Sequence, residues 1–484
     1  MNTSLSVFKK RDFKKFPAEY LLFFCFFLIL ITVKIITGFN GLYGQDSYEY
    51  LRYSEKLLKF FQTGENPGEF FWPILYPLCG AITAFLFGNI SFMLQLISMF
   101  SIIGAAFYFI KLIKIIHPNF QKFAILYTFL FFSLSPVIFR SSLLVMSDSL
   151  SLFFTAGSIY HIIKFIKSIE SKHLYLSVFF SLASVLTRYG NFVILLIPLL
   201  FLAATFIKHF NFKDLFISLI IGFILLLPHL LIHGSNSAKF LNHSWITTWS
   251  FSNFFKHYFD TIDGIQNYKF MNLIYTFSVF IHPAFLFCGI VFFVFIRKED
   301  IEDKIKKILA FSVLLNSFFL AGVPFQNLRF LIPSFPLAAV LLFPAFRRLW
   351  HKFFYGKKFI IISVILFSAI QSVLIYKLSY EIFELNNLEK NITSSLKVYK
   401  SSRDIYTFYI NGALENYKLP NRIFNLYNCD VNRIQKKSLV LFNENKFKDQ
   451  WKNKNPMLNW DFIKINYNLK RLEVFDSWIL YEVE

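Results

Sequence analysis

The chain has 484 residues, of which 56% are hydrophobic and 16% are charged, and its formal net charge is +21 at pH 7. Because about 25% of the residues in a typical soluble domain are charged, this composition excludes an ordinary soluble protein. The positive charge does not indicate nucleic-acid binding, since most of the excess lies beside apolar segments, where Lys and Arg keep loops in the cytoplasm. The four Cys residues have no spacing typical of a disulfide framework or a zinc site.

The first apolar segment runs from about Tyr20 to Phe39, after a basic stretch that ends at Lys15. It is too long for the core of a signal peptide and no small-residue cleavage site follows, so we expect an uncleaved first span. The basic flank predicts a cytoplasmic N-terminus. The loop at 41–89 is then outside, with an amphipathic stretch at Tyr48–Phe61 and a short apolar helix at Pro73–Phe87.

Further apolar segments recur at lengths that fit transmembrane helices. Lys and Arg are more frequent in the connections that this pattern places inside than in the loops that it places outside. We therefore expect about eleven spans with the C-terminus outside. The span boundary within residues 173–207 is the least defined, and merging the two spans there would invert the topology that follows. The ten spans after the first are expected at roughly 91–112, 121–139, 147–165, 173–187, 190–207, 214–232, 272–296, 307–324, 330–346 and 358–376.

The last part of the chain differs, because polar residues become common and basic residues are mixed with acids. Short runs there have strand-like composition. We predict an all-α polytopic membrane module over residues 1–376, and a small extracytoplasmic α/β domain over residues 377–484. The expected strands are Asp404–Ile410, Ser438–Phe442 and Trp478–Val483, and the expected short helices are Asn411–Tyr417 and Glu444–Trp451.

Two acids lie where predicted spans meet the outer face. Asp46 follows the first span, and Asp148 opens a later one. A carboxylate in such a position can act as a general base on an acceptor hydroxyl or amine. Each acid can equally cap the N-terminus of a helix, where the helix dipole favours negative charge. Because both are predicted at the same membrane face, they are candidates for a common catalytic site.

Basic residues are expected at the same face. Arg140 ends one predicted span, Arg188 lies between two spans, and Arg329 precedes another. Arginine suits bidentate binding of phosphate, and the alternative for each residue is snorkelling to lipid headgroups. Three arginines beside two acids favour a site for an anion. The remaining candidates for substrate binding on this face are Glu69 and Tyr48.

The histidines do not indicate a metal site. His229 and His233 are four residues apart and can share one helix face, with His243 further along, but no carboxylate or Cys is close to them in the sequence. We expect no required cofactor, although paired acids can bind a divalent ion. The chain has no Walker loop, dinucleotide-binding Gly motif or His-Glu-x-x-His motif, which argues against a nucleotide-driven pump and a zinc protease.

The order of these segments resembles the polytopic GT-C glycosyltransferases, in particular the group that contains the protein O-mannosyltransferases and the lipid A aminoarabinose transferase. The resemblance covers about residues 20–345 and depends on an ordered set of individually short motifs. These are Gly44-Gln-Asp-Ser-Tyr48, Trp72-Pro-Ile-Leu-Tyr-Pro77 with Leu86-Phe-Gly88, Ser135-Pro136 with Arg140 and Ser147-Asp148, Leu186-Thr-Arg-Tyr189, and Arg329-Phe-Leu-Ile-Pro333.

The resemblance implies a polyprenyl-phosphate-linked sugar donor, a lipid, glycan or protein acceptor, and transfer at the non-cytoplasmic face. The topology and composition favour a bacterial inner membrane. It implies that Asp46 is the base and that Asp148 lies near the acceptor or orients the site. Arg188 and Arg329 are then the phosphate candidates, because the segment Glu69–Pro73 lacks the Lys that the family often has there.

Two other functional classes remain open. A transporter or flippase of a lipid-linked glycan would share the many spans and a basic outer cavity. Transporters often contain internal repeats and helices broken deep in the membrane, whereas no repeat is evident in this sequence and the polar residues are expected at one face. The other class is an assembly or anchoring protein whose outer domain binds a partner.

Overall fold

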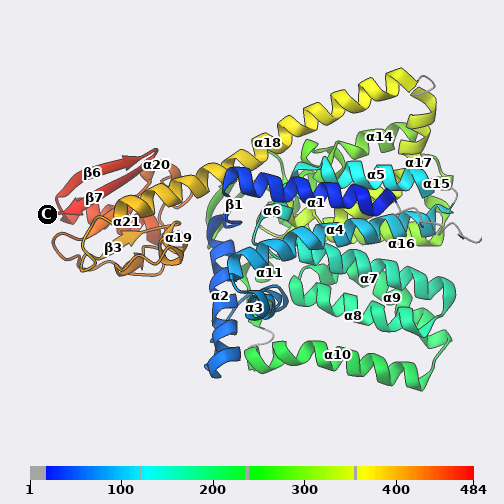
Figure 1. Cartoon of the computed structure of the whole chain (residues 1–484), viewed down its shortest axis with the longest axis horizontal. Coiled ribbons are helices and arrows are strands. Elements are labelled where there is room, and N and C mark those ends of the chain that lie inside the picture. Colours follow the sequence, from blue (N-terminus) through cyan, green and yellow to red (C-terminus); the bar gives the residue numbers. More distant parts are fainter. Residues whose placement is uncertain (1–17, 119–120, 235–238, 354–356) are drawn as a thin grey trace, which may run out of the picture.

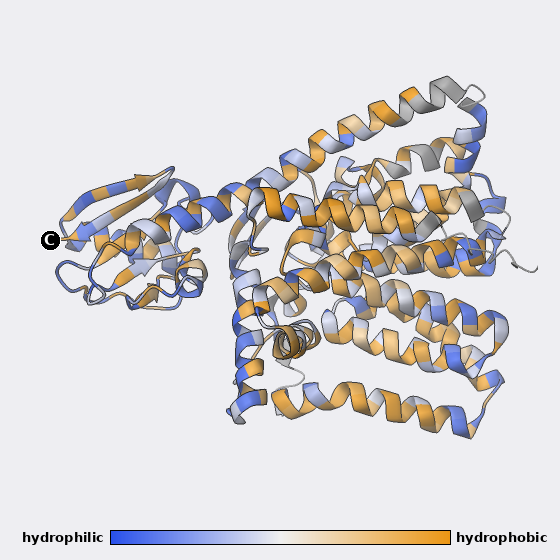
Figure 2. Ribbon diagram, viewed as in Figure 1, coloured by the Kyte–Doolittle hydropathy of each residue, from blue (hydrophilic) through white to orange (hydrophobic). Residues whose placement is uncertain are grey.

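The computed structural model describes residues 18–118, 121–234, 239–353 and 357–484. The basic stretch that ends at Lys15 lies outside these residues. Long helices lie roughly side by side in a bundle, and a smaller domain that contains the C-terminus lies beyond one end of it (Figure 1). Apolar residues dominate the bundle, whereas polar residues gather at its two ends and on the smaller domain (Figure 2).

Within the described residues, seven helices are long and apolar enough to cross a membrane. A further pair, α5 and α6, is bent by 67° around Ser135-Pro136 and gives an eighth candidate if it counts as one span. Pro136 lacks an amide hydrogen and cannot continue the helical hydrogen-bond ladder. The seven long helices and the bent pair are α1 (Ala18–Thr37), α4 (Ile90–Ile116), α5 (Gln121–Ser133), α6 (Pro136–Leu143), α7 (Asp148–Ser168), α9 (Asn191–Lys208), α10 (Phe212–His233), α16 (Lys304–Gly322) and α18 (Lys357–Leu396).

The number of eleven spans stays a prediction, because other expected spans form shorter or interrupted helices. The span at 272–296 is divided into four pieces, with Pro283 at the start of one of them. The least defined boundary, within 173–207, is a break of three residues after Thr187. The remaining bundle elements are α8 (Ser171–Thr187), α12 (Asn272–Thr276), α13 (Ser278–Ile281), η5 (Pro283–Phe285), α14 (Cys288–Phe295), α15 (Glu299–Glu302), η6 (Leu328–Leu331) and α17 (Ser334–Phe353).

The loop after the first span forms two helices, α2 (Gly44–Thr63) and α3 (Leu75–Phe87). In Figure 1, α2 runs across the end of the bundle that faces the smaller domain. Its buried face carries tyrosines and small residues, and it ends at Gly64, whose φ of 72° is the left-handed conformation that favours glycine. A second outer connection contains η3 (Lys239–Asn242), α11 (Ser244–Thr247), η4 (Phe251–Phe255), and the hairpin strands β1 (Tyr258–Thr261) and β2 (Gly264–Asn267).

The C-terminal domain is an α/β unit, as predicted from its composition. Its described residues form a five-stranded sheet of order β4-β3-β5-β7-β6, in which β3 is parallel to β4 and β5, and β7 is antiparallel to β5 and β6. The predicted boundary at 376/377 falls inside α18, which continues into the core of this domain. The elements are β3 (Ile405–Thr407), α19 (Asn411–Asn416), β4 (Ile423–Asn425), β5 (Leu439–Phe442), α20 (Glu444–Phe447), α21 (Asn455–Asn466), β6 (Leu469–Phe475) and β7 (Trp478–Val483).

Two sets of contacts hold the C-terminal domain on the end of the bundle. On one side, the Tyr48 hydroxyl donates a hydrogen bond of 2.5 Å to Glu389 of α18, and both side chains are buried. On the other side, the β1–β2 hairpin meets the segment after α20, where the Ile265 amide donates to the Gln450 carbonyl at 2.6 Å. A side chain at Gly264 would collide with that carbonyl. The domain is therefore fixed against the outer loops at two separate points.

Candidate functional site

A cavity of about 650 Å³ lies where the bundle meets the C-terminal domain. Its wall combines the N-terminal turn of α2, the segment before α3, the breaks beside α7 and between α8 and α9, and the η6 segment. Residues of the C-terminal domain close another side. The charged residues that line it are Asp46, Arg188, Asp263, Arg329 and Lys446.

The central feature of this cavity is an ion-paired cluster of two acids and two arginines. Arg329 donates from Nη1 to Asp46 Oδ2 at 2.7 Å and from Nε to Asp148 Oδ2 at 3.0 Å. Arg188 donates from Nη1 to the other oxygen of Asp148. One guanidinium therefore joins the two carboxylates, which are about a hundred residues apart in the sequence.

The two carboxylates differ in environment. The Asp148 side chain is only 3% exposed and accepts hydrogen bonds from both arginines, whereas the Asp46 side chain is 37% exposed and pairs with one of them. A buried carboxylate needs such partners, because an unpaired buried charge is very costly. Asp148 is therefore suited to hold the arginines in place, and Asp46 is suited to meet a molecule that enters the cavity.

The local sequence explains why these four residues meet. Each lies at a helix start or at a break: Asp46 in the first turn of α2, Asp148 at the first residue of α7, Arg188 between α8 and α9, and Arg329 in η6. A helix N-terminus favours negative charge, which suits both acids. The Asn327 side chain accepts a hydrogen bond of 3.1 Å from the Arg329 amide and so fixes the turn that presents this arginine.

Neutral partners support the cluster. The hydroxyls of Tyr50 and Ser147 are hydrogen-bonded at 2.9 Å and link α2 to the start of α7. The Arg188 guanidinium also lies 4.9 Å from the centre of the Phe330 ring. Burial and the neighbouring charge of Arg329 lower the pKa of Arg188 to about 9, so this side chain stays protonated at neutral pH.

The other predicted site residues lie around the cluster or outside the cavity. The Arg140 guanidinium lies 4.8 Å from the centre of the Tyr43 ring, which lines the cavity. Tyr48 does not line the cavity, and its hydroxyl is hydrogen-bonded to Glu389. Glu69 is exposed and does not line the cavity, although Phe71 and Trp72 of the same segment do.

Sequence reasoning missed the contribution of the C-terminal domain. Tyr409 and Lys446 both line the cavity, and the Lys446 amine lies 4.0 Å from the centre of the Tyr409 ring. Tyr409 has a φ of 78°, an uncommon conformation for a residue other than glycine. The Tyr409 hydroxyl comes within 3.8 Å of the ideal Cβ position at Gly44, two residues before Asp46. Nothing in the local sequence marks either residue, because Tyr409 lies in a strand-like apolar run, Lys446 lies in a polar segment, and both are more than 350 residues from Asp46.

Packing contacts explain the positions of His229 and His233. The rings of His229 and His233 are stacked with their centres 4.3 Å apart, and His233 Nε2 lies 2.9 Å from the Phe70 carbonyl oxygen. In the described part of the chain, no three His, Cys, Asp or Glu side chains are grouped as a metal site. The acids of the cavity are instead joined by arginine.

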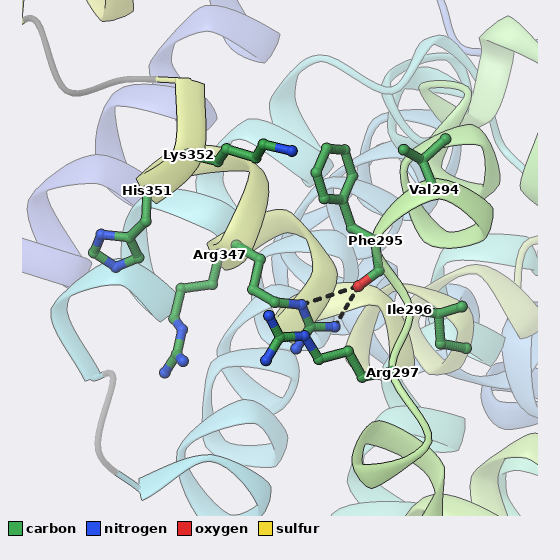
Figure 3. Close-up of a pocket in the computed structure, with 8 residues that line it drawn as sticks. Val294, Phe295, Ile296, Arg297, Arg347, His351 and Lys352 are labelled. Carbon is green, nitrogen blue, oxygen red and sulfur yellow. Dashed lines mark hydrogen bonds between the residues drawn. The ribbon is translucent and has the colours of Figure 1, made fainter.

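A second cavity, of about 630 Å³, lies between the end of α14 and the end of α17 (Figure 3). These elements are at the end of the bundle opposite the C-terminal domain (Figure 1). Arg348 donates to the Phe295 carbonyl and pairs with Asp300, so it ties α17 to the segment after α14. Among the described residues, the charged groups that line this cavity are all basic: Arg297, Arg347, Arg348, His351 and Lys352.

Comparison of the sequence with protein families and with curated proteins finds no match. The fold, in contrast, is similar to that of solved membrane proteins. ArnT from Cupriavidus metallidurans bound to undecaprenyl phosphate matches with a TM-score of 0.62 and 11% identity, over 96% of this chain and 98% of ArnT. The apo state of the same protein gives a TM-score of 0.55 and 9% identity, over 94% of this chain and 97% of ArnT.

An archaeal protein has a related fold. The oligosaccharyltransferase AglB from Archaeoglobus fulgidus, in complex with an inhibitory peptide and a dolichol-phosphate, matches with a TM-score of 0.53 and 10% identity, over 97% of this chain and 74% of AglB. At these identities the likeness establishes the fold alone. The predicted GT-C fold, a polytopic helical module followed by a small α/β domain, is confirmed.

Proposed function

We propose that this chain is an integral-membrane glycosyltransferase that takes a sugar from a polyprenyl-phosphate-linked donor. The acceptor is a lipid, a glycan or a protein, and transfer occurs at the non-cytoplasmic face of the membrane. The observation that carries the proposal is the Arg329 guanidinium that joins Asp46 to Asp148 in a cavity at one end of the bundle. Two proteins of the same fold were solved with a lipid phosphate, undecaprenyl phosphate in one and dolichol-phosphate in the other.

In this proposal, Asp46 is the general base. Its carboxylate accepts the proton of the acceptor hydroxyl or amine while the acceptor atom bonds to the anomeric carbon of the sugar. The bond between that carbon and the phosphate oxygen breaks, and the phosphate leaves with the bonding electrons. The proton on Asp46 then passes to water. The donor is already activated by its phosphate, so the reaction requires no cofactor.

The arginines would stabilise the leaving phosphate, because preorganised cations act strongly where water is excluded. Arg329 uses different nitrogens for its two carboxylates. Its Nε can therefore keep the hydrogen bond to Asp148 while Nη1 turns from Asp46 to the phosphate. This exchange would leave Asp46 more basic at the moment when it has to accept a proton, since a neighbouring cation favours the ionised carboxylate.

The first test is mass spectrometry of envelope glycolipids and glycoproteins from a strain that lacks the protein. The strain is complemented with the wild type, with Asp46→Asn or with Glu49→Gln. Glu49 is a matched control, because it lies on α2 three residues from Asp46 and pairs with Arg52 instead of lining the cavity.

We expect a sugar-sized mass to disappear on deletion and to return with the wild type and Glu49→Gln only. Return of that mass with Asp46→Asn at normal protein levels would exclude Asp46 as the base. If deletion instead moves an unchanged glycolipid from one membrane face to the other, the protein is a transporter of a lipid-linked glycan.

A further inference from the structure

The C-terminal domain presents one basic side chain to the cavity that contains Asp46. Lys446 lies in α20, and the Asn443 side chain accepts a hydrogen bond of 3.0 Å from its amide, which fixes the short helix. The Lys446 amine contacts the face of the Tyr409 ring, and the centre of the Phe447 ring is 5.7 Å away. An ammonium over aromatic faces is attracted by the rings and is held without losing its charge.

The charge of Lys446 differs from that of the two arginines in the cavity. Arg188 and Arg329 are both ion-paired with carboxylates, whereas Lys446 forms no ion pair with any carboxylate in the described part of the chain. The acid that interacts electrostatically with Lys446 is Glu389, whose carboxylate already accepts the hydrogen bond from Tyr48. The positive charge of Lys446 is therefore the least neutralised of the cavity.

The surroundings of Lys446 suit an anionic ligand with an apolar part. Lys446 lines the cavity, and Phe71 and Trp72 from the segment before α3 line the same cavity. Tyr409 links the lysine to the start of α2, because its hydroxyl lies close to Gly44. An anion beside Lys446 would thus lie near the helix turn that carries Asp46, with aromatic rings available to its non-polar portion.

We propose that Lys446 binds the phosphate of the lipid-linked donor, so that the C-terminal domain completes the donor site. This inference rests on the proposed function. A phosphodiester between a sugar and a lipid carries one negative charge, and a lysine ammonium is a suitable point charge to bind it. The donor would then be held between the membrane module and the C-terminal domain, with its anomeric carbon directed toward Asp46.

The test measures the binding of undecaprenyl phosphate and of undecaprenol to the purified full-length protein by native mass spectrometry. The variants are Lys446→Gln, Lys446→Arg and, as a matched control, Lys448→Gln, which changes an exposed lysine two residues away that does not line the cavity. The quantity compared is the preference for the phosphate over the alcohol within each variant. Because this ratio is internal to one sample, it does not depend on the folded fraction.

We expect Lys446→Gln to reduce the preference by about tenfold and Lys446→Arg to retain most of it. Lys448→Gln should match the wild type. An unchanged preference in Lys446→Gln, or an equal loss in Lys446→Gln and Lys446→Arg, would overturn the inference and leave the proposed function intact. If the wild type itself shows no preference for the phosphate, the proposed donor class is wrong and the inference fails with it.

Discussion

The two ends of the bundle carry cavities of similar volume that are lined by different sets of charged residues. At the end under the C-terminal domain, Arg188 and Arg329 are both ion-paired with Asp148, and Arg329 also pairs with Asp46. At the other end, the titratable side chains that line the cavity are all basic in the part of the chain that the structure describes, and Arg348 pairs with Asp300, which does not line it. An enrichment of Lys and Arg is typical of the cytoplasmic ends of membrane spans, which is the side that the sequence predicts for this end. The two cavities therefore differ in the acids among their lining residues, since Asp46 and Asp263 line the first and no acid among the described residues lines the second.

The largest expected effect comes from the acid that is open to the cavity. Asp46→Asn keeps the size of the side chain and removes its ability to accept a proton. We expect the rate of sugar transfer to fall by about 10²–10⁴-fold, as is typical when a general base is lost. The measurement is a single-turnover rate with saturating donor, with Glu49→Gln as the control. A fall in Glu49→Gln of similar size would remove the distinction between Asp46 and its neighbours on α2.

The next effect concerns the bridging guanidinium. Arg329→Lys retains one positive charge but cannot donate to two carboxylates from separate nitrogens, so it breaks the link between Asp46 and Asp148. We expect a loss of transfer of about 10²-fold with most of the folded protein retained. The assay is the same single-turnover rate, together with thermal unfolding. Full activity in this variant would show that charge alone suffices and would weaken the contrast between the two ends.

A smaller effect is expected on the pH dependence of transfer. Partial desolvation by the surrounding protein lowers the pKa of Lys446, and the negative charge of Glu389 offsets part of this shift. Because a lysine loses its charge as the pH rises through its pKa, transfer should decline at a lower alkaline pH than an ordinary lysine would allow. Lys446→Arg should move this decline to higher pH, since arginine stays protonated. The measurement is the rate against pH for the two proteins, and superimposable alkaline limbs would contradict the role of Lys446.

The smallest effect on transfer is expected at the opposite end. Arg348→Gln removes the tie between α17 and the segment after α14, and it leaves Asp300, which is 8% exposed, without its guanidinium partner. We expect a destabilisation of about 1–3 kcal/mol, measured as a lower thermal midpoint. Transfer per folded molecule should change by less than about twofold, because distant sites are largely independent. A loss as large as that of Arg329→Lys would show that the two ends are coupled.

Much of the membrane module could be predicted, because hydropathy and the distribution of Lys and Arg are local properties of the sequence that indicate spans and their orientation. They placed Asp46, Asp148, Arg188 and Arg329 at one membrane face, and the structure brings these four side chains into contact. The interrupted helices at 272–296 were not predicted, because an apolar composition alone does not reveal where the backbone leaves the helical path.

The contribution of the C-terminal domain could not be predicted for a different reason. Tyr409 and Lys446 reach the cavity only because a separate domain is docked on α2 and on the β1–β2 hairpin. Such docking depends on surface complementarity between segments far apart in the sequence. Neither hydrophobic periodicity nor charge count reports on that complementarity, so a cation such as Lys446 looks like any other solvated lysine in the sequence.

The continuous helix α18 has a mechanical consequence. With forty residues and a rise of 1.5 Å per residue it is about 60 Å long, and its last turns are part of the core of the C-terminal domain. The contact of Glu389 with Tyr48 acts as a pivot near one end of this rod. A tilt of only about 5° about that pivot would displace the far end, about 48 Å away, by about 4 Å. A change in the thickness or curvature of the bilayer that tilts α18 would therefore change the position of the C-terminal domain relative to Asp46.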